Sequence, residues 1–502
     1  MDTQIKSLPR LNASFNKSNA NSSLDASSTI VHLGVGAFHR AHQAWYTQKA
    51  LETENSDSWK IIGVSLRSAT MAEQLNPQNG LYTVVEQNSE GYNTQIIDVI
   101  KEVIVAPESP DTVLAVLSDV RTKIVSLTIT EKGYCHDPAS GQLHLSHPDI
   151  QHDLNCDLTK HQHPRSAIGY LVWAMHLRWQ RNLSGFTVMS CDNLPANGQL
   201  LRNLVLSFAH QLAPDFAEHV ATEYAFPSSM VDRIVPAMTE QVRNKFCQQL
   251  GYDDHGLIVT ESFSQWVIED NFAQDRPAWE KAGALLTQDV HAFETMKLRL
   301  LNGSHSSIAY VGYLSGFKTV AETIENPECF AFISAIMREE LLPSVDVPKG
   351  IDVKQYCQQL LQRFANPHLH HQTYQIAMDG SQKLPQRLLH ALAFQLDNQG
   401  SIDRLCFVIA AWIQYVSGLD LNGKEISVQD PYTIELASAY YTANGDLTEW
   451  VEEIFCMDTI FDQNVKQNKQ VKSKVCYWLA HMREQSRACD SLHSLQVVVG
   501  QC

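Results

Sequence analysis

The feature that most constrains the fold is a short apolar run that passes directly into a glycine turn. The run is Thr29–Leu33, and the next residues read Gly34-Val-Gly36-Ala-Phe38-His39-Arg-Ala-His. This order predicts a β-strand, a tight turn and the start of a helix. Glycines in such a turn let the backbone approach a pyrophosphate, whose charge then rests on the helix N-terminus. The stretch therefore predicts a dinucleotide-binding domain, with Gly34, Gly36, Phe38 and His39 as candidate cofactor contacts.

The dinucleotide fingerprint is incomplete at two places. G-x-G-x-x-G needs a third glycine where this chain has His39, and a G-x-G alone also serves ordinary strand-to-helix turns. The next predicted strand, Lys60–Ser65, is followed by Arg67 and Ser68 instead of the acid that usually binds the ribose hydroxyls of NAD. Arg67 and Ser68 could instead accept a 2′-phosphate, so NAD and NADP are both open. A solvent-facing Arg67 is the alternative.

Further strands alternate with helical patterns over the first 285 residues. The strands are predicted at 82–86, 95–100, 124–130 and 186–189. Between the last two, apolar residues recur at i, i+3, i+4, i+7 and i+11 from Ile168, as on an amphipathic helix. Such alternation predicts a largely parallel sheet covered on both faces, with ligands at the carboxyl ends of its strands. We expect Thr130, Glu131 and Asn193 at those ends, and turn chemistry is the alternative for Asp192-Asn193.

Helical periodicity dominates after about residue 285. Helices are predicted near 330–341, 353–365, 385–396, 402–417 and 470–486. At 502 residues the chain also exceeds the size at which one hydrophobic core stops growing. We therefore expect an α/β chain with three parts: a flexible, Asn- and Ser-rich arm over 1–28, a Rossmann-type domain over 29–285, and a mostly α-helical domain over 286–502.

A lysine, an asparagine and a histidine open the helical domain at spacings of five and three. At about 100° per residue of an α-helix, Asn302 lies about 140° and His305 about 80° from Lys297, so all three share one side. Aliphatic residues lie on that side as well. The mixture suits a partly dry pocket, where burial disfavours a charged lysine. A surface lysine beside locally bonded polar residues is the alternative.

A second polar stretch, Met378–Arg387, contains two cations. Lys383 and Arg387 could bind a carboxylate, with the arginine supplying a planar fork. The alternative is that both cations lie on the solvated first turn of a helix.

Charge and cysteine pattern exclude several partners and locations. The formal net charge of −17 argues against a general affinity for nucleic acid or anionic membranes, although a local basic pocket could still bind an anionic substrate. The eleven cysteines form no C-x-x-C pair and read as reduced thiols, and the N-terminus lacks a hydrophobic signal core. We therefore expect a cytoplasmic protein. A monomer and a small homo-oligomer are both compatible with the sequence.

Twenty-one histidines raise the question of a metal site. The tight clusters are His161/His163 and His368/His370/His371, and neither has a cysteine or carboxylate at ligand spacing. We interpret them as solvated loop histidines and predict no metal.

Together these segments resemble the mannitol dehydrogenase family of long-chain, metal-independent polyol dehydrogenases. The resemblance extends from Ile30 to about Pro431 and rests on five motifs in order: GVGAFHRAH, TITEKGY, SCDN, FPSSMVDRIVP and KLRLLNGSHS. Within the family, the segments QWVIEDNF, ASGQL and QIAMDGSQKLPQR are most similar to members that act on sugar acids. The resemblance implies a Rossmann-type N-terminal domain, a helical C-terminal domain and a cleft between them.

The resemblance also implies catalytic roles for matching residues. Lys297 matches the general acid/base of the family. Asn193 and Asn302 match two asparagines that hold the reacting oxygen, and His305 matches the histidine that orients the substrate.

Further matches and two departures concern the substrate and cofactor. Asp232 and Lys383 match substrate-binding residues, and Glu294 matches a glutamate linked to proton passage. Mannitol dehydrogenases carry an arginine where this chain has Gln375, which fits a change of substrate within the family. The acidic pair expected after the second strand is replaced by Ser68-Ala69, which puts a preference for NAD in doubt.

These matches predict an NAD(P)-dependent oxidoreductase that interconverts D-fructuronate and D-mannonate. Lys297 would donate a proton to the alkoxide in reduction and accept the hydroxyl proton in oxidation. A dehydrogenase for a neutral polyol such as mannitol or arabinitol is the first alternative, because a polyol needs no cation in the pocket. A non-catalytic nucleotide-binding protein is the remote alternative.

Overall fold

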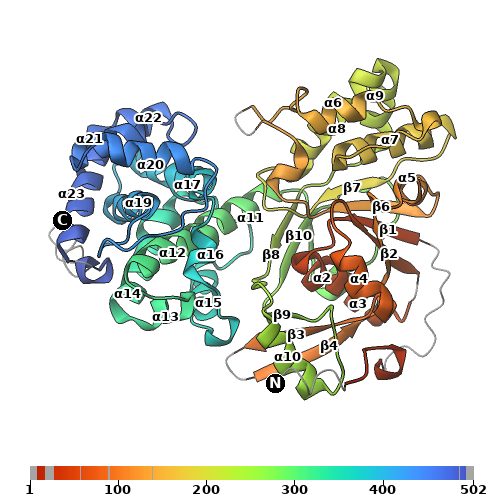
Figure 1. Ribbon diagram of the computed structural model, residues 1–502, viewed down its shortest axis with the longest axis horizontal. Coiled ribbons are helices and arrows are strands. Elements are labelled where there is room, and N and C mark those ends of the chain that lie inside the picture. Colours follow the sequence, from red (N-terminus) through yellow and green to blue (C-terminus); the bar gives the residue numbers. More distant parts are fainter. Residues whose placement is uncertain are drawn as a thin grey trace. The chain divides into compact units, whose positions relative to one another are not determined.

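A computed structural model describes residues 8–16, 28–56, 58–88, 91–137, 140–485 and 487–492. The chain forms two compact units, residues 1–291 and 292–502 (Figure 1). Most of the predicted N-terminal arm lies outside the described residues. Its described part, residues 8–16, packs on the first unit through the buried side chain of Leu11, whose N–H donates to the carbonyl of Asp253.

The first unit is built on a five-stranded sheet in the order β5-β2-β1-β6-β7. All four pairings are parallel, which confirms the predicted Rossmann-type fold. The strands are β1 (Ser28–Leu33), β2 (Trp59–Ser65), β5 (Ile100–Val105), β6 (Thr122–Leu127) and β7 (Thr187–Ser190). Because they run in one direction, their carboxyl ends share one edge of the sheet, where ligands bind in this class of fold.

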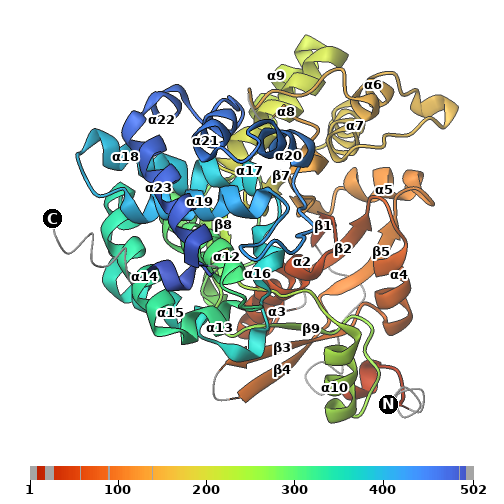
Figure 2. The same cartoon turned by 60° about the vertical axis from the view of Figure 1, so that its left-hand side comes forward.

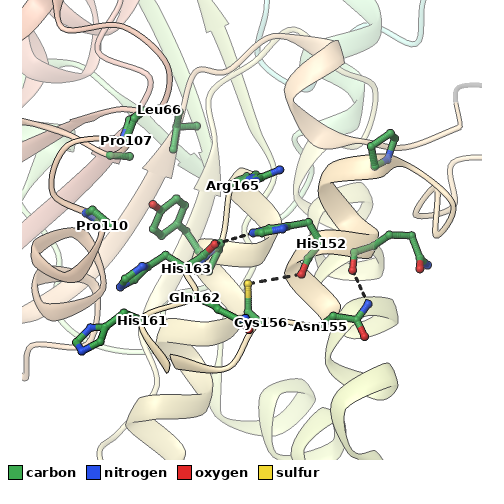
Figure 3. Close-up of a pocket in the computed structure, with 15 residues that line it drawn as sticks. Leu66, Pro107, Pro110, His152, Asn155, Cys156, His161, Gln162, His163 and Arg165 are labelled. Atoms are coloured by element: carbon green, nitrogen blue, oxygen red, sulfur yellow. Dashed lines mark hydrogen bonds between the residues drawn. The ribbon is translucent and has the colours of Figure 1, made fainter. Parts of the chain in front are cut away.

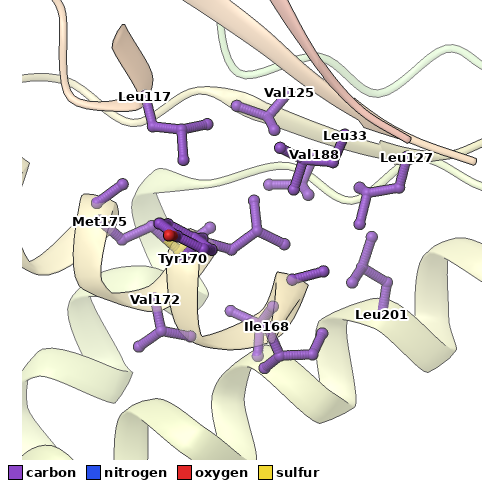
Figure 4. Close-up of a cluster of buried hydrophobic side chains, with 14 of the residues drawn as sticks. Leu33, Leu117, Val125, Leu127, Ile168, Tyr170, Val172, Met175, Val188 and Leu201 are labelled. Atoms are coloured by element: carbon purple, nitrogen blue, oxygen red, sulfur yellow. The ribbon is translucent and has the colours of Figure 1, made fainter. Parts of the chain in front are cut away.

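Helices cover both faces of this sheet. The helices of the first unit are α2 (Ala37–Ala41), α3 (Gln43–Glu54), α4 (Thr70–Leu75), α5 (Pro110–Leu117), α6 (Pro148–Leu154), α7 (Ala167–Gln180), α8 (Asn197–Leu212), α9 (Pro214–Glu223) and α10 (Glu240–Leu250). Of these, α10 packs against the strands at 82–88 and 258–261, outside this sheet. On one face, the strand residues Leu33, Val125 and Val188 pack against Ile168 of α7 and Leu201 of α8 (Figure 4). Each fully buried side chain of this size contributes about 1.5–3 kcal/mol. The amphipathic helix predicted from Ile168 is therefore the main cover of this face.

Two of the predicted strands do not belong to the parallel sheet. β3 (Tyr82–Asn88) and β4 (Gly91–Ile97) pair antiparallel, and β9 (Ile258–Glu261) adds to β3 in parallel. The reason is chain length, because the two residues between β3 and β4 are far too few for the crossover that parallel neighbours need. Figure 2 shows β3, β4 and β9 side by side. A third sheet, in the order β11-β10-β8, contains β8 (Ser229–Asp232), β10 (Gln265–Glu269) and β11 (Leu285–Thr287).

The second unit is helical and includes three π-helices, η6, η7 and η10. The elements are α11 (His291–Met296), η6 (Lys297–Gly303), α12 (Ser304–Leu314), α13 (Val320–Glu325), α14 (Pro327–Ala335), η7 (Ile336–Leu341), α15 (Val353–Phe364), α16 (Thr373–Ala377), α17 (Gly380–Leu384), η10 (Pro385–Leu389), α18 (His390–Asp397), α19 (Asp403–Val416), α20 (Thr433–Thr442), α21 (Leu447–Phe455), α22 (Gln463–Gln467) and α23 (Lys469–Gln485). Helical structure is present at all five predicted positions.

The core of the second unit is α19. Every residue from Arg404 to Val416 is buried, and the neighbouring helices include α12, α20 and α23 (Figure 2). The apolar run that the sequence shows here is thus the centre of a helical domain. Among the described residues, no helix has both the length and the hydropathy needed to cross a membrane.

Candidate functional site

The glycine loop after β1 has the geometry of a dinucleotide-binding turn. Gly34 has φ +92°, and a Cβ there would lie 2.2 Å from the carbonyl oxygen of Thr128, so only glycine fits. The Thr128 hydroxyl donates to the Gly34 carbonyl at 2.7 Å and fixes the turn. Gly36, the N-cap of α2, is exposed, as is the next residue. The backbone at the start of α2 is therefore open to a pyrophosphate, and the loop fits a dinucleotide cofactor.

His39 packs beneath the loop, and its role as a cofactor contact needs correction. Its side chain is fully buried, and its ring stacks on that of His32 with the centroids 3.4 Å apart. The third glycine of the fingerprint permits close packing of the helix on the strand. Here the stacked rings of His39, from the helix, and His32, from the strand, pack at this position instead. Burial lowers the pKa of His32 to about 3 and that of His39 well below its usual value, so both rings are neutral at physiological pH.

The other predicted cofactor contacts lie near the same edge of the parallel sheet. Phe38, in the first turn of α2, is partly exposed and stacks on His42 at 4.9 Å between centroids. Arg67 and Ser68 follow β2 and are exposed. Thr130 and Glu131 follow β6. The edge therefore offers a glycine loop and a cation, but no acid directly after β2.

Asp192 holds together the ends of β6 and β7. Its carboxylate accepts the N–H groups of Ile129 at 2.9 Å and Thr130 at 3.1 Å, and the hydroxyl of Tyr134 at 2.8 Å. Burial raises the pKa of this carboxyl. Thr130 has φ +62°, a strained conformation for a β-branched residue that needs such outside support. Asp192 thus does more than form a turn, since it fixes the loop beside Asn193, which is exposed.

A cavity of about 1030 Å³ lies at the carboxyl ends of β2 and β5 (Figure 3). Leu66, Ala106 and Pro107 line it from the strand ends, and Tyr170 lines it from α7. Because α/β sheets bind ligands at this edge, the cavity adds space for a ligand within the first unit.

The predicted catalytic helix of the second unit contains a π-helix, which corrects its geometry. Lys297, Asn302 and His305 are 4%, 7% and 6% exposed. Residues 297–303 form η6, and α12 begins only at residue 304. In a π-helix the hydrogen bonds join residues five apart. Lys297 and Asn302 therefore lie one turn apart on the same side of the helix. The angle between them about the helix axis is smaller than the 140° expected of an α-helix.

A second π-helix packs against the first, backbone to backbone. A Cβ on Gly303 of η6 would lie 2.9 Å from the carbonyl oxygen of Arg387 in η10. Arg299 of η6 donates a hydrogen bond to the carbonyl of Gln386. The Arg387 guanidinium in turn donates to the Ser306 hydroxyl at 3.2 Å. Arg387 is thus held near the helix that carries Lys297, although ninety residues separate them in sequence.

Gly303→Ala should separate these two helices. The added methyl group meets a backbone oxygen that cannot rotate away, so we expect a loss of about 1–3 kcal/mol of stability. Thermal unfolding measures this loss. Ser304→Ala is the matched control, because the buried Ser304 hydroxyl has no hydrogen-bond partner in the described chain, so its loss should be tolerated. Equal melting temperatures for both variants would contradict the close contact.

Cationic side chains surround His305. Its ring lies 4.7 Å from Phe364 and 5.4 Å from His371 between centroids. Burial, reinforced by positive charge nearby, lowers the pKa of His305 well below its usual value. The nearby positive charges are those of Arg363, Arg387 and Lys297, and the adjoining His371 contributes as well. His305 is therefore neutral, and its Nε2 has no hydrogen-bond partner among the described residues.

His371 is not the solvated loop histidine that its sequence cluster predicts. His368 and His370 are exposed, as expected for loop histidines. His371 instead packs edge-on against His305, and burial together with Lys383 lowers its pKa to about 4. Its carbonyl accepts the N–H of Val320, which fixes the segment. No spacing pattern marks this position, because the contact joins residues 66 apart in sequence.

The polar stretch at 378–387 is helical from Gly380 onward. Lys383 lies in α17 and Arg387 in η10, and both are partly buried. The Lys383 amine donates to the carbonyls of Ile376, at 3.3 Å, and Met378. The solvated first turn considered as an alternative is therefore not what the structure shows.

The remaining predicted site residues divide between the two units. In the first unit, Asp232 is buried at the end of β8, opposite Gln265 of β10. In the second unit, Glu294 is buried in α11, one turn before Lys297. The second unit thus brings together Lys297, Asn302, His305, Lys383 and Arg387, and the first carries Asn193, Asp232 and the glycine loop.

Two family models match the chain: the mannitol dehydrogenase Rossmann domain over residues 28–281 and the mannitol dehydrogenase C-terminal domain over residues 289–483. D-mannonate oxidoreductase of Escherichia coli K12 is 45% identical over 446 residues, 88% of this chain and 90% of that protein. Mannitol 2-dehydrogenase of Aspergillus fumigatus is 41% identical over 425 residues, 84% of each chain. The ternary complex of Pseudomonas fluorescens mannitol 2-dehydrogenase with NAD and D-mannitol matches with a TM-score of 0.87 at 32% identity, over 97% of this chain and 99% of that one.

Proposed function

The chain belongs to the mannitol dehydrogenase family, and we propose that it is a fructuronate reductase, a nicotinamide-dependent oxidoreductase that interconverts D-fructuronate and D-mannonate. The E. coli relative at 45% identity, a D-mannonate oxidoreductase, supports a sugar-acid substrate. NAD is the proposed cofactor, because the P. fluorescens relative was solved with it. NADP stays an alternative, since Arg67 and Ser68 replace the usual acid after β2.

The observation that carries the sugar-acid proposal is the charge around His305. The charges of Arg363, Arg387 and Lys297 help to lower the pKa of His305. The charge of Lys383 helps to lower the pKa of the adjoining His371. A carboxylate entering this region would meet several positive groups and two neutral imidazoles. Charge-assisted hydrogen bonds to arginine and lysine are about twice as strong as neutral ones. A neutral polyol gains nothing comparable, so the arrangement favours an anionic substrate.

The chain's own residues provide proton transfer and oxygen binding. Lys297 gives a proton to the substrate oxygen in reduction and takes it back in oxidation, with Glu294 beside it for proton passage. Asn302 is the proposed N–H donor to the same oxygen, Asn193 matches the second donor of the family, and His305 orients the substrate. A general acid contributes about 10²–10⁴-fold, and one oxygen-binding donor contributes about 3 kcal/mol of barrier.

The glycine loop supplies the cofactor site. The backbone at Gly34 and Gly36 would hold the pyrophosphate at the start of α2, and Arg67 would lie near the ribose. A bound nicotinamide would supply hydride chemistry. Asp232 and Lys383 complete the substrate contacts.

Two other functions are consistent with the family. A mannitol or arabinitol 2-dehydrogenase is the first, because the A. fumigatus relative at 41% identity is a mannitol 2-dehydrogenase. A nucleotide-binding protein without turnover is the remote second, and the competent side chains at every matched catalytic position argue against it. A cytoplasmic location fits the ten described cysteines, all of which are free. The proposed partners are small molecules, with the chain acting as a monomer or a small homo-oligomer.

An absorbance assay of nicotinamide oxidation and reduction tests the proposal. It pairs D-fructuronate/D-mannonate and fructose/mannitol with NAD(H) and NADP(H). We expect fast turnover of the sugar acid and at most slow turnover of the polyol. Turnover of the polyol alone would replace the proposed substrate by the first alternative. Cofactor binding without turnover of either pair would support the remote one.

A further inference from the structure

Two loop histidines and a distant aspartate meet at the rim of the cavity in the first unit. His161 and His163 follow a 3₁₀ turn (Leu158–Lys160), and Asp111 lies in the first turn of α5. His163 Nε2 is 2.8 Å from one carboxylate oxygen of Asp111, and His161 Nδ1 is 3.9 Å from the other. One ligand atom from each residue lies within 4.8 Å of the other two. In Figure 3 both histidines lie on the side of the cavity next to Pro110, the neighbour of Asp111.

We propose that Asp111, His161 and His163 form a binding site for a divalent transition-metal ion, with Zn²⁺ as the best-fitting ion. Zinc binds nitrogen and carboxylate oxygen at about 2.0–2.2 Å in a tetrahedral arrangement, which places neighbouring ligand atoms about 3.3 Å apart. The separations of 2.8 and 3.9 Å run to the two different oxygens of the Asp111 carboxylate and lie on either side of that value. Small side-chain rotations would equalise them. Two imidazoles and one carboxylate are also a ligand set that zinc commonly uses.

The surroundings of these residues fit an ion that enters from solvent and is then held. The side chains of His161 and Asp111 are 82% and 74% exposed, whereas that of His163 is 14% exposed. The carbonyl of His163 interacts with the Nε2 of His152 at 3.1 Å, which anchors the loop to α6. His163 is thus held in place before the ion binds, and the exposed side chains of His161 and Asp111 can move to bind it.

A neighbouring cluster shows why the site is assigned here and not deeper in the cavity. His152, Asp153 and Cys156 are equally close to one another. The Asp153 carboxylate, however, already accepts the N–H groups of Arg165 and Ser166 and the Ser166 hydroxyl. Burial raises the pKa of the Cys156 thiol to about 11, so it is protonated and a poor ligand. In the Asp111 cluster, the described hydrogen bond to the ligand atoms joins two of the ligands themselves, His163 Nε2 and an Asp111 carboxylate oxygen, and a bound ion would replace it.

The bound ion would tie the loop at 161–163 to the start of α5 across the cavity rim. Three protein ligands leave one tetrahedral position open, and both histidines also line the cavity. The expectation of no metal rested on ligand spacing along the chain. The carboxylate that completes the set comes from fifty residues upstream, which a spacing rule does not detect. The site is independent of the proposed reaction, which does not use it.

Titration of metal-free full-length protein with Zn²⁺ by calorimetry tests this proposal. We expect wild type to bind one equivalent that the double variant H161A/H163A does not bind, with a weakening of at least about 100-fold. Zn²⁺ should also raise the Tm of wild type and leave that of the double variant unchanged. Wild type and H161A/H163A have the same exposed thiols as other Zn²⁺ ligands. The difference in Zn²⁺ binding between the two proteins therefore reports this site.

Two further variants complete the test. Asp111→Asn keeps the size of the side chain and should weaken binding as well. H144A/H147A removes another histidine pair of the same unit, with ring centroids 6.0 Å apart against 6.3 Å for His161 and His163, and should bind like wild type. Equal Tm values without metal show that all variants fold. Unchanged Zn²⁺ binding in both H161A/H163A and Asp111→Asn would overturn the proposal, as would its loss in H144A/H147A.

Discussion

Lys297→Ala should reduce kcat by at least about 10²–10⁴-fold, the range expected for loss of a general acid/base. Lys297 is buried on the π-helix that also carries Asn302, and alanine there can neither give nor take the substrate proton. Binding of the nicotinamide cofactor, measured by calorimetry, should be unchanged, because the glycine loop belongs to the first unit. A small primary amine in the assay should restore part of the rate, since it can enter the space left by the side chain.

Lys318→Ala is the matched control for this experiment. Lys318 follows the same run of helices but is exposed, so its removal should leave kcat and cofactor binding as they are. Turnover of Lys297→Ala at the wild-type rate would refute the assignment of the general acid/base. A loss of rate without rescue by amine, together with lowered Tm, would indicate a structural role instead.

Arg387→Gln should lower kcat/KM for D-fructuronate by about 10- to 100-fold, mainly through KM, and leave a neutral ketose such as fructose almost unaffected. A hydrogen bond to a charged group is worth about 1.5–3 kcal/mol, and each 1.4 kcal/mol is tenfold. Glutamine keeps a donor for the Ser306 hydroxyl, so the local structure should hold. Lys383→Gln should act in the same direction.

The matched control here is Arg338→Gln on η7, whose side chain is exposed at the surface. It removes the same charge at an exposed position and should not change kcat/KM. The ratio of kcat/KM for D-fructuronate to kcat/KM for fructose measures the effect directly. An equal loss for sugar acid and neutral ketose would mean that Arg387 supports the fold of the site and does not read a carboxylate.

Local sequence signals were sufficient for the framework of both units. A β-rich run ending at Gly34 predicts a strand and turn because no other residue tolerates the backbone there. The apolar spacing from Ile168 predicts the helix that covers the sheet. The helices of the second unit follow from the same periodicity. Each of these signals lies within a few residues, where the pattern and the structure are directly linked.

The errors concern contacts between residues distant in sequence. Strands 82–88 and 91–97 show the same β-pattern as the parallel strands, and only the pairing distinguishes them. His371 resembles its exposed neighbours until it packs on His305. The glycine-turn pattern placed His39 with the cofactor, whereas its ring stacks on His32 of the preceding strand. Asp111 joins two histidines fifty residues away. No spacing rule contains these partners, because folding brings them together.

Because Lys297–Gly303 is a π-helix, the relative positions of Lys297, Asn302 and His305 depend on the number of residues in this stretch as well as on their identity. A π-helix places more residues in each turn than an α-helix does. Deletion of one residue between Lys297 and Gly303 would rotate Lys297 by about 100° relative to His305, even if the lysine, asparagine and histidine were all retained. During evolution this stretch should therefore accept substitutions far more readily than insertions or deletions. A relative one residue shorter here would have lost the arrangement while still carrying its three characteristic residues.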